Sequence, residues 1–68
     1  MVREMTVAEE KKVRYEIALV NRTKPMFVDI ERVDELGENE RKVFCKIKGF
    51  KYTVLMRGDI VLATMARI

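Results

Sequence analysis

Hydrophobic and polar positions alternate most regularly between Arg41 and Arg57. A two-residue turn at Gly49-Phe50 folds this stretch into a β-hairpin, because glycine at the first turn position suits a type II′ turn. One face of that hairpin is apolar and carries Val43, Cys45, Ile47, Tyr52, Val54 and Met56. The other face carries Lys42, Phe44, Lys46, Lys48, Lys51, Thr53, Leu55 and Arg57. We expect the first face to lie on a core and the second to meet water or an anionic partner.

A third strand follows the hairpin. Gly58-Asp59 predicts a second tight turn, so that residues 42–48, 51–57 and 60–67 form a three-stranded meander. In the simplest register Leu62 lies opposite Leu55 and beside Phe44, which places an apolar row within the basic face. We expect an N-terminal segment, a second subunit or a ligand to cover that row.

The N-terminal part of the chain also alternates. Apolar and polar residues alternate over residues 12–20, which predicts another strand. Thr6-Val7-Ala8-Glu9 matches a capping box and allows one helical turn before that strand. Residues 1–5 are expected to form a loose, disordered terminus.

Residues 25–36 permit two interpretations. Alternation favours a strand as far as residue 31, with apolar positions at Met26, Val28 and Ile30. Steps of three favour a helix, with apolar positions at Ile30, Val33 and Leu36. Pro25 near the start and Gly37 after the end also suit the helix. We favour the strand, and the helix stays open as the alternative.

These elements predict one small, mainly β domain over residues 1–68. We expect an OB-like or SH3-like partly open barrel of about five strands, with room for one short helix. Because unpaired strand edges favour aggregation, we also expect the chain to form a homodimer. Gly58-Asp59-Ile60-Val61-Leu62 resembles the turn and strand that end many small β-barrels, including OB-fold translation initiation factors. The resemblance covers only this stretch, and it assigns the chain to no family.

The inventory of reactive residues argues against an enzyme. The sequence has no histidine and no serine, which excludes a Ser-His triad. With a single cysteine there is no intramolecular disulfide, and a Cys/His metal site lacks ligands. Cys45 falls in the apolar alternation, so we expect a buried thiol. No cofactor motif, metal site or small-molecule substrate is evident, and we expect none.

Charge is divided unevenly along the chain. Residues 1–40 hold 7 basic and 10 acidic side chains, whereas residues 41–68 hold 7 basic and 1 acidic side chain. A basic surface that includes aromatic rings is typical of nucleic-acid binding. The leading hypothesis is therefore a non-enzymatic module for DNA or RNA. Its predicted binding residues are Lys42, Phe44, Lys46, Lys48, Phe50, Lys51 and Arg57.

Two other interpretations stay open. Lysines on strands also serve solubility, so the basic face can simply be solvated. Alternatively, the chain is an interaction or assembly module, in which the acidic segment 29–40 meets the basic hairpin of another subunit. In that case Phe44, Leu55 and Leu62 form the apolar seam. No apolar run of membrane-spanning length and no secretory leader is evident, so we expect a cytoplasmic protein that does not enter a membrane.

Overall fold

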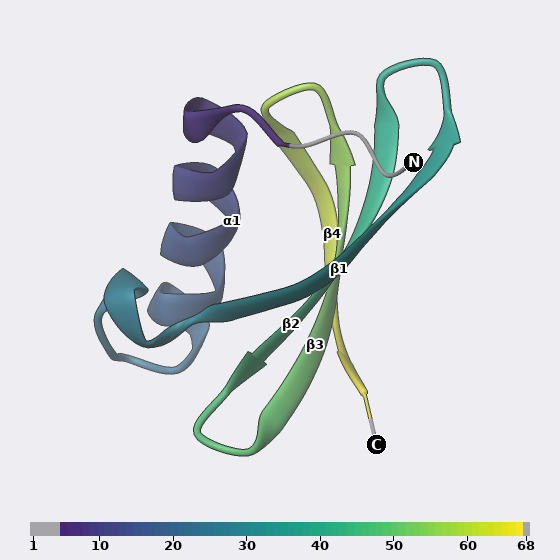
Figure 1. Ribbon diagram of the computed structural model, residues 1–68. Coiled ribbons are helices and arrows are strands. Elements are labelled where there is room, and N and C mark those ends of the chain that lie inside the picture. Colours follow the sequence, from purple (N-terminus) through teal and green to yellow (C-terminus); the bar gives the residue numbers. More distant parts are fainter. Residues whose placement is uncertain (1–4, 68) are drawn as a thin grey trace.

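A computed structural model describes residues 5–67 (Figure 1). It contains one α-helix, one short 3-10 helix and four strands. In chain order these are α1 (Val7–Val20), η1 (Pro25–Phe27), β1 (Asp29–Gly37), β2 (Glu40–Ile47), β3 (Phe50–Arg57) and β4 (Ile60–Arg67). The expectation of a disordered terminus at residues 1–5 falls almost wholly outside the described residues.

The strands form one antiparallel sheet in the order β1-β2-β3-β4, and α1 lies against one face of it (Figure 1). The prediction of a small, mainly β fold is therefore confirmed. The predicted number of about five strands is corrected to four within residues 5–67. The sheet is open rather than closed into a barrel, because β1 and β4 lie at opposite edges and do not pair with each other.

The strand predicted at residues 12–20 is wrong, because α1 occupies this segment. The capping box is real: the Glu9 backbone N–H donates to Thr6 Oγ1 (3.2 Å), and the Thr6 N–H donates to Glu9 Oε1 (2.9 Å). Val13 and Ile17, four residues apart, are fully buried against the sheet. Tyr15 and Leu19 do not belong to this buried stripe, because they are 59% and 61% exposed. Only a narrow stripe of α1 is buried. The exposed apolar residues between the buried ones produce the alternating pattern that is typical of a strand.

The strand favoured for residues 25–36 is present with different bounds, and the alternative helix over this segment is wrong. Pro25 begins a single 3-10 turn, and β1 then runs from Asp29 to Gly37, beyond the predicted end near residue 31. The register shifts between Ile30 and Arg32, where Glu31 is an extra residue. This β-bulge lets Ile30 and Val33 face the same side although they are three residues apart. A bulged strand thus explains the steps of three that suggested a helix.

The β2–β3 turn lies one residue earlier than predicted. Lys48 and Gly49 form it with φ angles of 49° and 85°, and two positive values indicate a type I′ turn. Phe44 therefore pairs with Thr53, and Lys46 with Lys51. The predicted pairings, such as Lys48 with Lys51, are wrong. The two faces nevertheless keep their predicted residues, because this correction moves each partner by two positions.

The Gly58-Asp59 turn between β3 and β4 is confirmed, since Arg57 pairs with Ile60 across it. An irregularity at Leu62 then shifts the register, so Leu55 pairs with Ala63 instead of Leu62. On its other side Leu55 pairs with Lys42. The predicted apolar row of Phe44, Leu55 and Leu62 is therefore not formed as a row across the strands.

The core lies between α1 and the sheet. Its buried apolar residues are Val13, Ile17, Ala18, Val28, Val33, Val43, Cys45, Ile47, Val54 and Met56. This set contains every member of the predicted apolar hairpin face except Tyr52, which is partly buried beside it. The Cys45 side chain has no exposed surface, and burial raises the pKa of its thiol to about 11. The prediction of a buried thiol is confirmed.

Candidate nucleic-acid interface

The sheet face opposite α1, here called the open face, is organised in rows of residues that pair across the strands. Three rows follow one another from the end with the β2–β3 turn. They are Asp29–Lys46–Lys51–Arg67, Arg32–Phe44–Thr53–Met65 and Asp34–Lys42–Leu55–Ala63. The first row is fully charged, the second contains the aromatic ring, and the third becomes apolar toward β4.

Phe44 is the centre of the open face. The Arg32 guanidinium carbon lies 4.6 Å from the centroid of its ring, the Arg67 guanidinium carbon 5.0 Å, and Lys42 Nζ 5.6 Å. These cations come from β1, β4 and β2. Each cation over an aromatic face is worth about 0.5–2 kcal/mol, depending on how far it is desolvated. The result is an aromatic ring enclosed by positive charge from three strands.

Arg67 spans the open face near the β2–β3 end. Its Nη2 donates to the Cys45 carbonyl oxygen (2.9 Å) and to Glu31 Oε1 (3.2 Å), and its Nε donates to the Tyr52 carbonyl oxygen (3.2 Å). Arg67 lies on β4 and Glu31 on β1, the two edge strands. A single side chain thus bridges the sheet from one edge to the other, and three acceptors fix its orientation.

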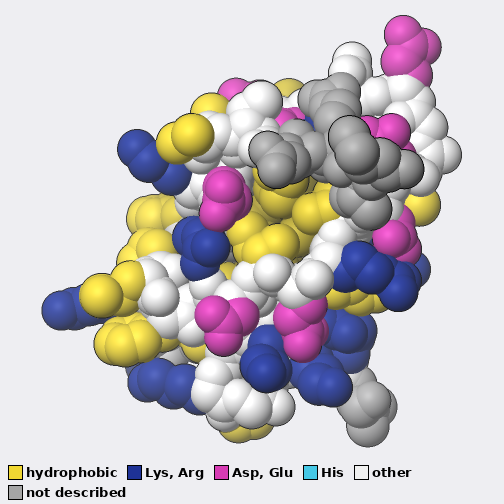
Figure 2. All heavy atoms as spheres, in the orientation of Figure 1, with side chains coloured by type: hydrophobic (Ala, Val, Ile, Leu, Met, Phe, Trp, Pro, Cys, Tyr) yellow, Lys and Arg dark blue, Asp and Glu magenta, His cyan; other side chains and the backbone are white. Residues whose placement is uncertain are grey.

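A hollow of about 360 Å³ lies on the open face beside this bridge. Its lining residues are Glu31, Arg32, Phe44, Lys51 and Arg67. In Figure 2, basic side chains gather near the C-terminal end of the chain, with acidic side chains beside them. The hollow thus contains one aromatic ring, three cations and the Glu31 carboxylate as a hydrogen-bond acceptor. This combination suits a ligand in which a flat ring is attached to an anionic group.

Carboxylates neutralise part of this charge. Ion pairs join Arg32 to Asp34 (2.9 Å), Arg57 to Glu40 (3.1 Å) and Arg67 to Glu31 (3.2 Å). Within residues 5–67, Lys42, Lys46 and Lys51 form no ion pair, although Lys42 and Lys46 pair across the strands with Asp34 and Asp29. Lys51 has only Lys46 and Arg67 as cross-strand neighbours. Lys46, Lys51 and Arg67 therefore form the most positive part of the open face. The repulsion between these neighbouring cations is mildly destabilising.

The predicted site residues separate into two groups. Lys42, Phe44, Lys46, Lys51 and Arg57 share the open face, with Arg57 at the end far from the hollow. Lys48 lies in the β2–β3 turn with its Nζ 5.6 Å from the Phe27 ring, and Phe50, 63% exposed, pairs with Ile47 on the α1 side. Lys48 and Phe50 therefore do not line the hollow.

Sequence reasoning missed Glu31, Arg32 and Arg67, which line the hollow. The bulge at Glu31 places both Glu31 and Arg32 on the open face, and no alternating pattern reveals a bulge in advance. Arg67 was missed for a similar reason. Alignment of β4 with β3 across the Gly58-Asp59 turn alone places Arg67 opposite Phe50 on the α1 side, and only the irregularity at Leu62 moves it opposite Lys51.

The residues of the alternative assembly seam, Phe44, Leu55 and Leu62, lie in different rows. Phe44 and Leu55 are partly buried, and Leu62 is 49% exposed. The acidic strand β1 already pairs with the basic strand β2 of the same chain. Complementarity between segment 29–40 and the hairpin is thus present inside one molecule.

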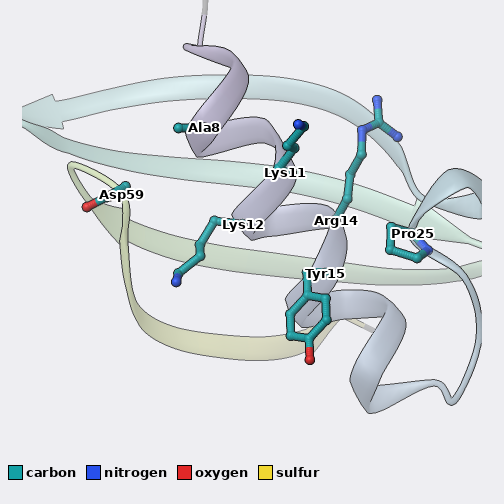
Figure 3. Close-up of a pocket in the computed structure, with 7 residues that line it drawn as sticks. All are labelled: Ala8, Lys11, Lys12, Arg14, Tyr15, Pro25 and Asp59. Atoms are coloured by element: carbon teal, nitrogen blue, oxygen red, sulfur yellow. The ribbon is translucent and has the colours of Figure 1, made fainter.

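A second hollow, of about 620 Å³, runs along the exposed side of α1. Its lining side chains point in different directions rather than toward one position (Figure 3). Arg14 is also held by Glu10 (3.1 Å) and by the carbonyl oxygen of Val28. This hollow therefore lacks the converging polar groups that a specific small-molecule site needs.

Among residues 5–67 no group of three or more Cys, Asp or Glu side chains is arranged to hold a metal ion. In the same part of the chain no helix has the length and apolarity needed to cross a membrane. Comparisons with protein-family models, with curated proteins and with solved structures gave no match. The candidate interface therefore rests on its own geometry.

Proposed function

We propose that the protein is a non-enzymatic module that binds single-stranded DNA or RNA on the open face. The observation that carries this proposal is the cation-enclosed ring of Phe44, which lies at a hollow of about 360 Å³. A partner must bring both negative charge and flat rings to use such a surface. Single-stranded nucleic acid does so, because its unpaired bases are free to stack.

Two parts of the open face have different roles in the proposed binding, one toward phosphates and one toward bases. The row Lys46–Lys51–Arg67 neutralises phosphates and releases counterions. At the hollow, a base stacks on the guanidinium plane of Arg32, which lies 4.6 Å from the Phe44 ring centroid, and contacts the edge of that ring. Each stacked base contributes about 1–3 kcal/mol.

The single strand is preferred over the duplex because of the shape of the face. The aromatic group lies in a hollow of a sheet, whereas the helix α1 lies on the opposite side. Duplex grooves are usually read by a helix or by a projecting strand ribbon. In a duplex the bases are already stacked, so Phe44 and Arg32 would contact none of them.

The proposal is tested by titrating a labelled oligonucleotide, single- or double-stranded, at two salt concentrations. We expect micromolar binding of the single strand, with a slope of log K against log salt of about −2 if three cations contact phosphates. The variant Lys46→Glu/Lys51→Glu should bind roughly tenfold more weakly or worse. Its matched control is Lys11→Glu/Lys12→Glu, which makes the same charge change on exposed α1 residues.

Equal losses in both double variants would mean that only total charge matters, and binding that ignores salt would reject the phosphate contacts. The alternative proposal, in which segment 29–40 meets the basic hairpin of another subunit, is the weaker one. β1 pairs with β2 in the same chain, so the acidic segment and the basic hairpin already meet within one molecule.

A further inference from the structure

One end of the molecule exposes large apolar side chains. The C-terminal end of α1, the 3-10 turn η1 and the β2–β3 turn lie together at this end (Figure 1). The Tyr52 hydroxyl of β3 donates to Asn21 Oδ1 after α1 (3.1 Å). Lys48 Nζ in the β2–β3 turn lies 5.6 Å from the centroid of the Phe27 ring of η1. The apolar side chains of this end are between 49% and 74% exposed, and they are Leu19, Val20, Met26, Phe27 and Phe50. Single exposed apolar residues are common on protein surfaces, whereas a group of this kind indicates an interaction site.

The three segments carry only positive charge. Residues 17–28 and 46–52 contain no Asp or Glu. The exposed cations beside the apolar side chains are Arg22, Lys24 and Lys48. Asp29, the acidic residue that follows η1, lies on the open face, where it pairs with Lys46. These three cations and the five apolar residues are here called the basic-apolar end.

Two of these cations occupy backbone conformations that suit other residues better. Among residues 5–67, three non-glycine residues have a positive φ, namely Arg22 (52°), Asn39 (60°) and Lys48 (49°). Asparagine tolerates this conformation, whereas arginine and lysine adopt it at a cost in stability. Glycine is the usual residue just after a helix, and Asn-Gly is the usual pair in a type I′ turn. Positive charge is therefore present at two positions where a neutral residue would be more stable, and such departures from local rules are expected at functional sites.

We propose that the basic-apolar end binds the surface of an anionic lipid bilayer. In this position Met26 and Phe50 enter the boundary between head groups and acyl chains, and the three cations contact the negatively charged head groups. A chain bound in this way lies on the bilayer and does not cross it. The proposal departs from the expectation drawn from the sequence, which considered only segments that span a membrane.

The chemistry and shape of this end favour lipid as the partner. Leu19, Val20 and Met26 are aliphatic and cannot stack on bases, so nucleic acid would leave them exposed. The five apolar side chains project from a helix end and two turns, and they line neither the hollow along α1 nor the hollow on the open face. A fluid bilayer accommodates such projecting groups, whereas a rigid partner needs a matching cavity. Lipid binding goes beyond nucleic-acid binding and does not depend on it.

Sedimentation of the full chain with lipid vesicles, in the absence of nucleic acid, tests the proposal first. We expect vesicles of phosphatidylcholine with about one third phosphatidylserine to bind at least about tenfold more tightly than vesicles of phosphatidylcholine alone. Arg22→Gly/Lys48→Asn should weaken binding to the anionic vesicles about tenfold. The same variant should not lower the thermal stability, because both new residues suit a positive φ. The matched control Lys11→Gln/Lys12→Gln removes two exposed cations from α1 and should stay within about twofold of the wild-type affinity.

Three outcomes would overturn the proposal. The first is equal binding, or no binding, to anionic and neutral vesicles. The second is an equal loss in the two double variants, because total charge alone would then determine the affinity. The third is that Arg22→Gly/Lys48→Asn loses binding to a single-stranded oligonucleotide but not to vesicles, which would assign this end to nucleic acid.

Fluorescence gives a second test, because the sequence contains no tryptophan. Met26→Trp introduces one at a residue that is 74% exposed, and its emission should shift to shorter wavelength when anionic vesicles are added. Leu36→Trp is the control, since Leu36 is 57% exposed beside the β1–β2 turn, at the other end of the sheet from the β2–β3 turn. An emission shift of Met26→Trp that is absent, or no larger than that of Leu36→Trp, would contradict insertion at the basic-apolar end.

Discussion

The Glu9 carboxylate is hydrogen-bonded to Arg41, whose Nη1 lies 2.5 Å from Glu9 Oε2. The other carboxylate oxygen accepts the Thr6 backbone N–H, so one side chain both caps α1 and joins it to β2. Glu9 is 6% exposed and Arg41 3%. Burial raises the pKa of Glu9, but hydrogen bonds from Arg41 and Thr6 and the charge of Arg41 outweigh it. The net pKa therefore lies below the usual 4.5.

Removing the charge of Glu9 should strongly destabilise the fold. In Glu9→Gln the capping group is retained, but the Arg41 guanidinium stays buried without a counter-charge, at a cost of roughly 3 kcal/mol. Urea denaturation measures the free energy of unfolding. The control Glu10→Gln breaks the partly exposed pair with Arg14 and should cost only about 0.5 kcal/mol. Equal effects of the two substitutions would mean that the buried pair adds nothing.

The same ion pair predicts an acid-sensitive stability. Because the folded-state pKa of Glu9 is lowered, its contribution is fully present above the unfolded value near 4.5 and is lost as the pH falls through the lower folded value. Urea denaturation across an acidic pH series should therefore show a falling free energy of unfolding. Glu9→Gln should fall less steeply than the wild-type chain, and parallel curves would exclude Glu9 as a source of this dependence.

Cys45 should report global unfolding. Burial raises the pKa of its thiol from 9.0 to about 11, so little thiolate forms at neutral pH and reagents cannot reach it. We expect native protein to react with a thiol reagent much more slowly than urea-unfolded protein. The free energy of unfolding should also decrease as the pH rises from 9.0 toward about 11, because the unfolded thiol ionises first. Equally fast labelling of both states would contradict the burial of Cys45.

The β2–β3 turn offers a test of the register. Lys48 adopts a φ of 49°, which lysine tolerates poorly and asparagine tolerates well. Lys48→Asn creates the Asn-Gly pair preferred in type I′ turns and should raise the free energy of unfolding by about 0.5 kcal/mol. Lys48→Val should lower it, because a β-branched residue is strained at positive φ. If both substitutions had the same effect on thermal unfolding, the turn would lie elsewhere.

The hairpin shows which features could be predicted from the sequence. Alternation identified the members of each face, because a turn displaced by one residue leaves every side chain on the same side of the sheet. The cross-strand neighbours could not be identified in this way. Both Lys48-Gly49 and Gly49-Phe50 are acceptable turn pairs, and only the folded chain distinguishes between them.

The helix and the hollow show where local pattern fails. Val13 and Ile17 are buried on one side of α1, as a helix requires. The exposed Tyr15 and Leu19 are also apolar, so the positions 13, 15, 17 and 19 together show the alternation that is typical of a strand. Arg32 reaches Phe44 only because Glu31 is an extra residue in β1. Of the three cations around the Phe44 ring, only Lys42 was predicted from the sequence, whereas Arg32 and Arg67 reach the ring through register shifts in β1 and β4.

The central claim is that Phe44, held among cations, contacts the bases of a single strand. Titration of one labelled single-stranded oligonucleotide with Phe44→Leu and Phe50→Leu tests it most directly. Both variants lose one aromatic ring, but Phe50 is 63% exposed at the start of β3 and outside the hollow. We predict that Phe44→Leu weakens binding about tenfold or more and that Phe50→Leu stays within about twofold of the wild-type affinity. Unchanged affinity in Phe44→Leu, or an equal loss in both variants, would contradict the claim.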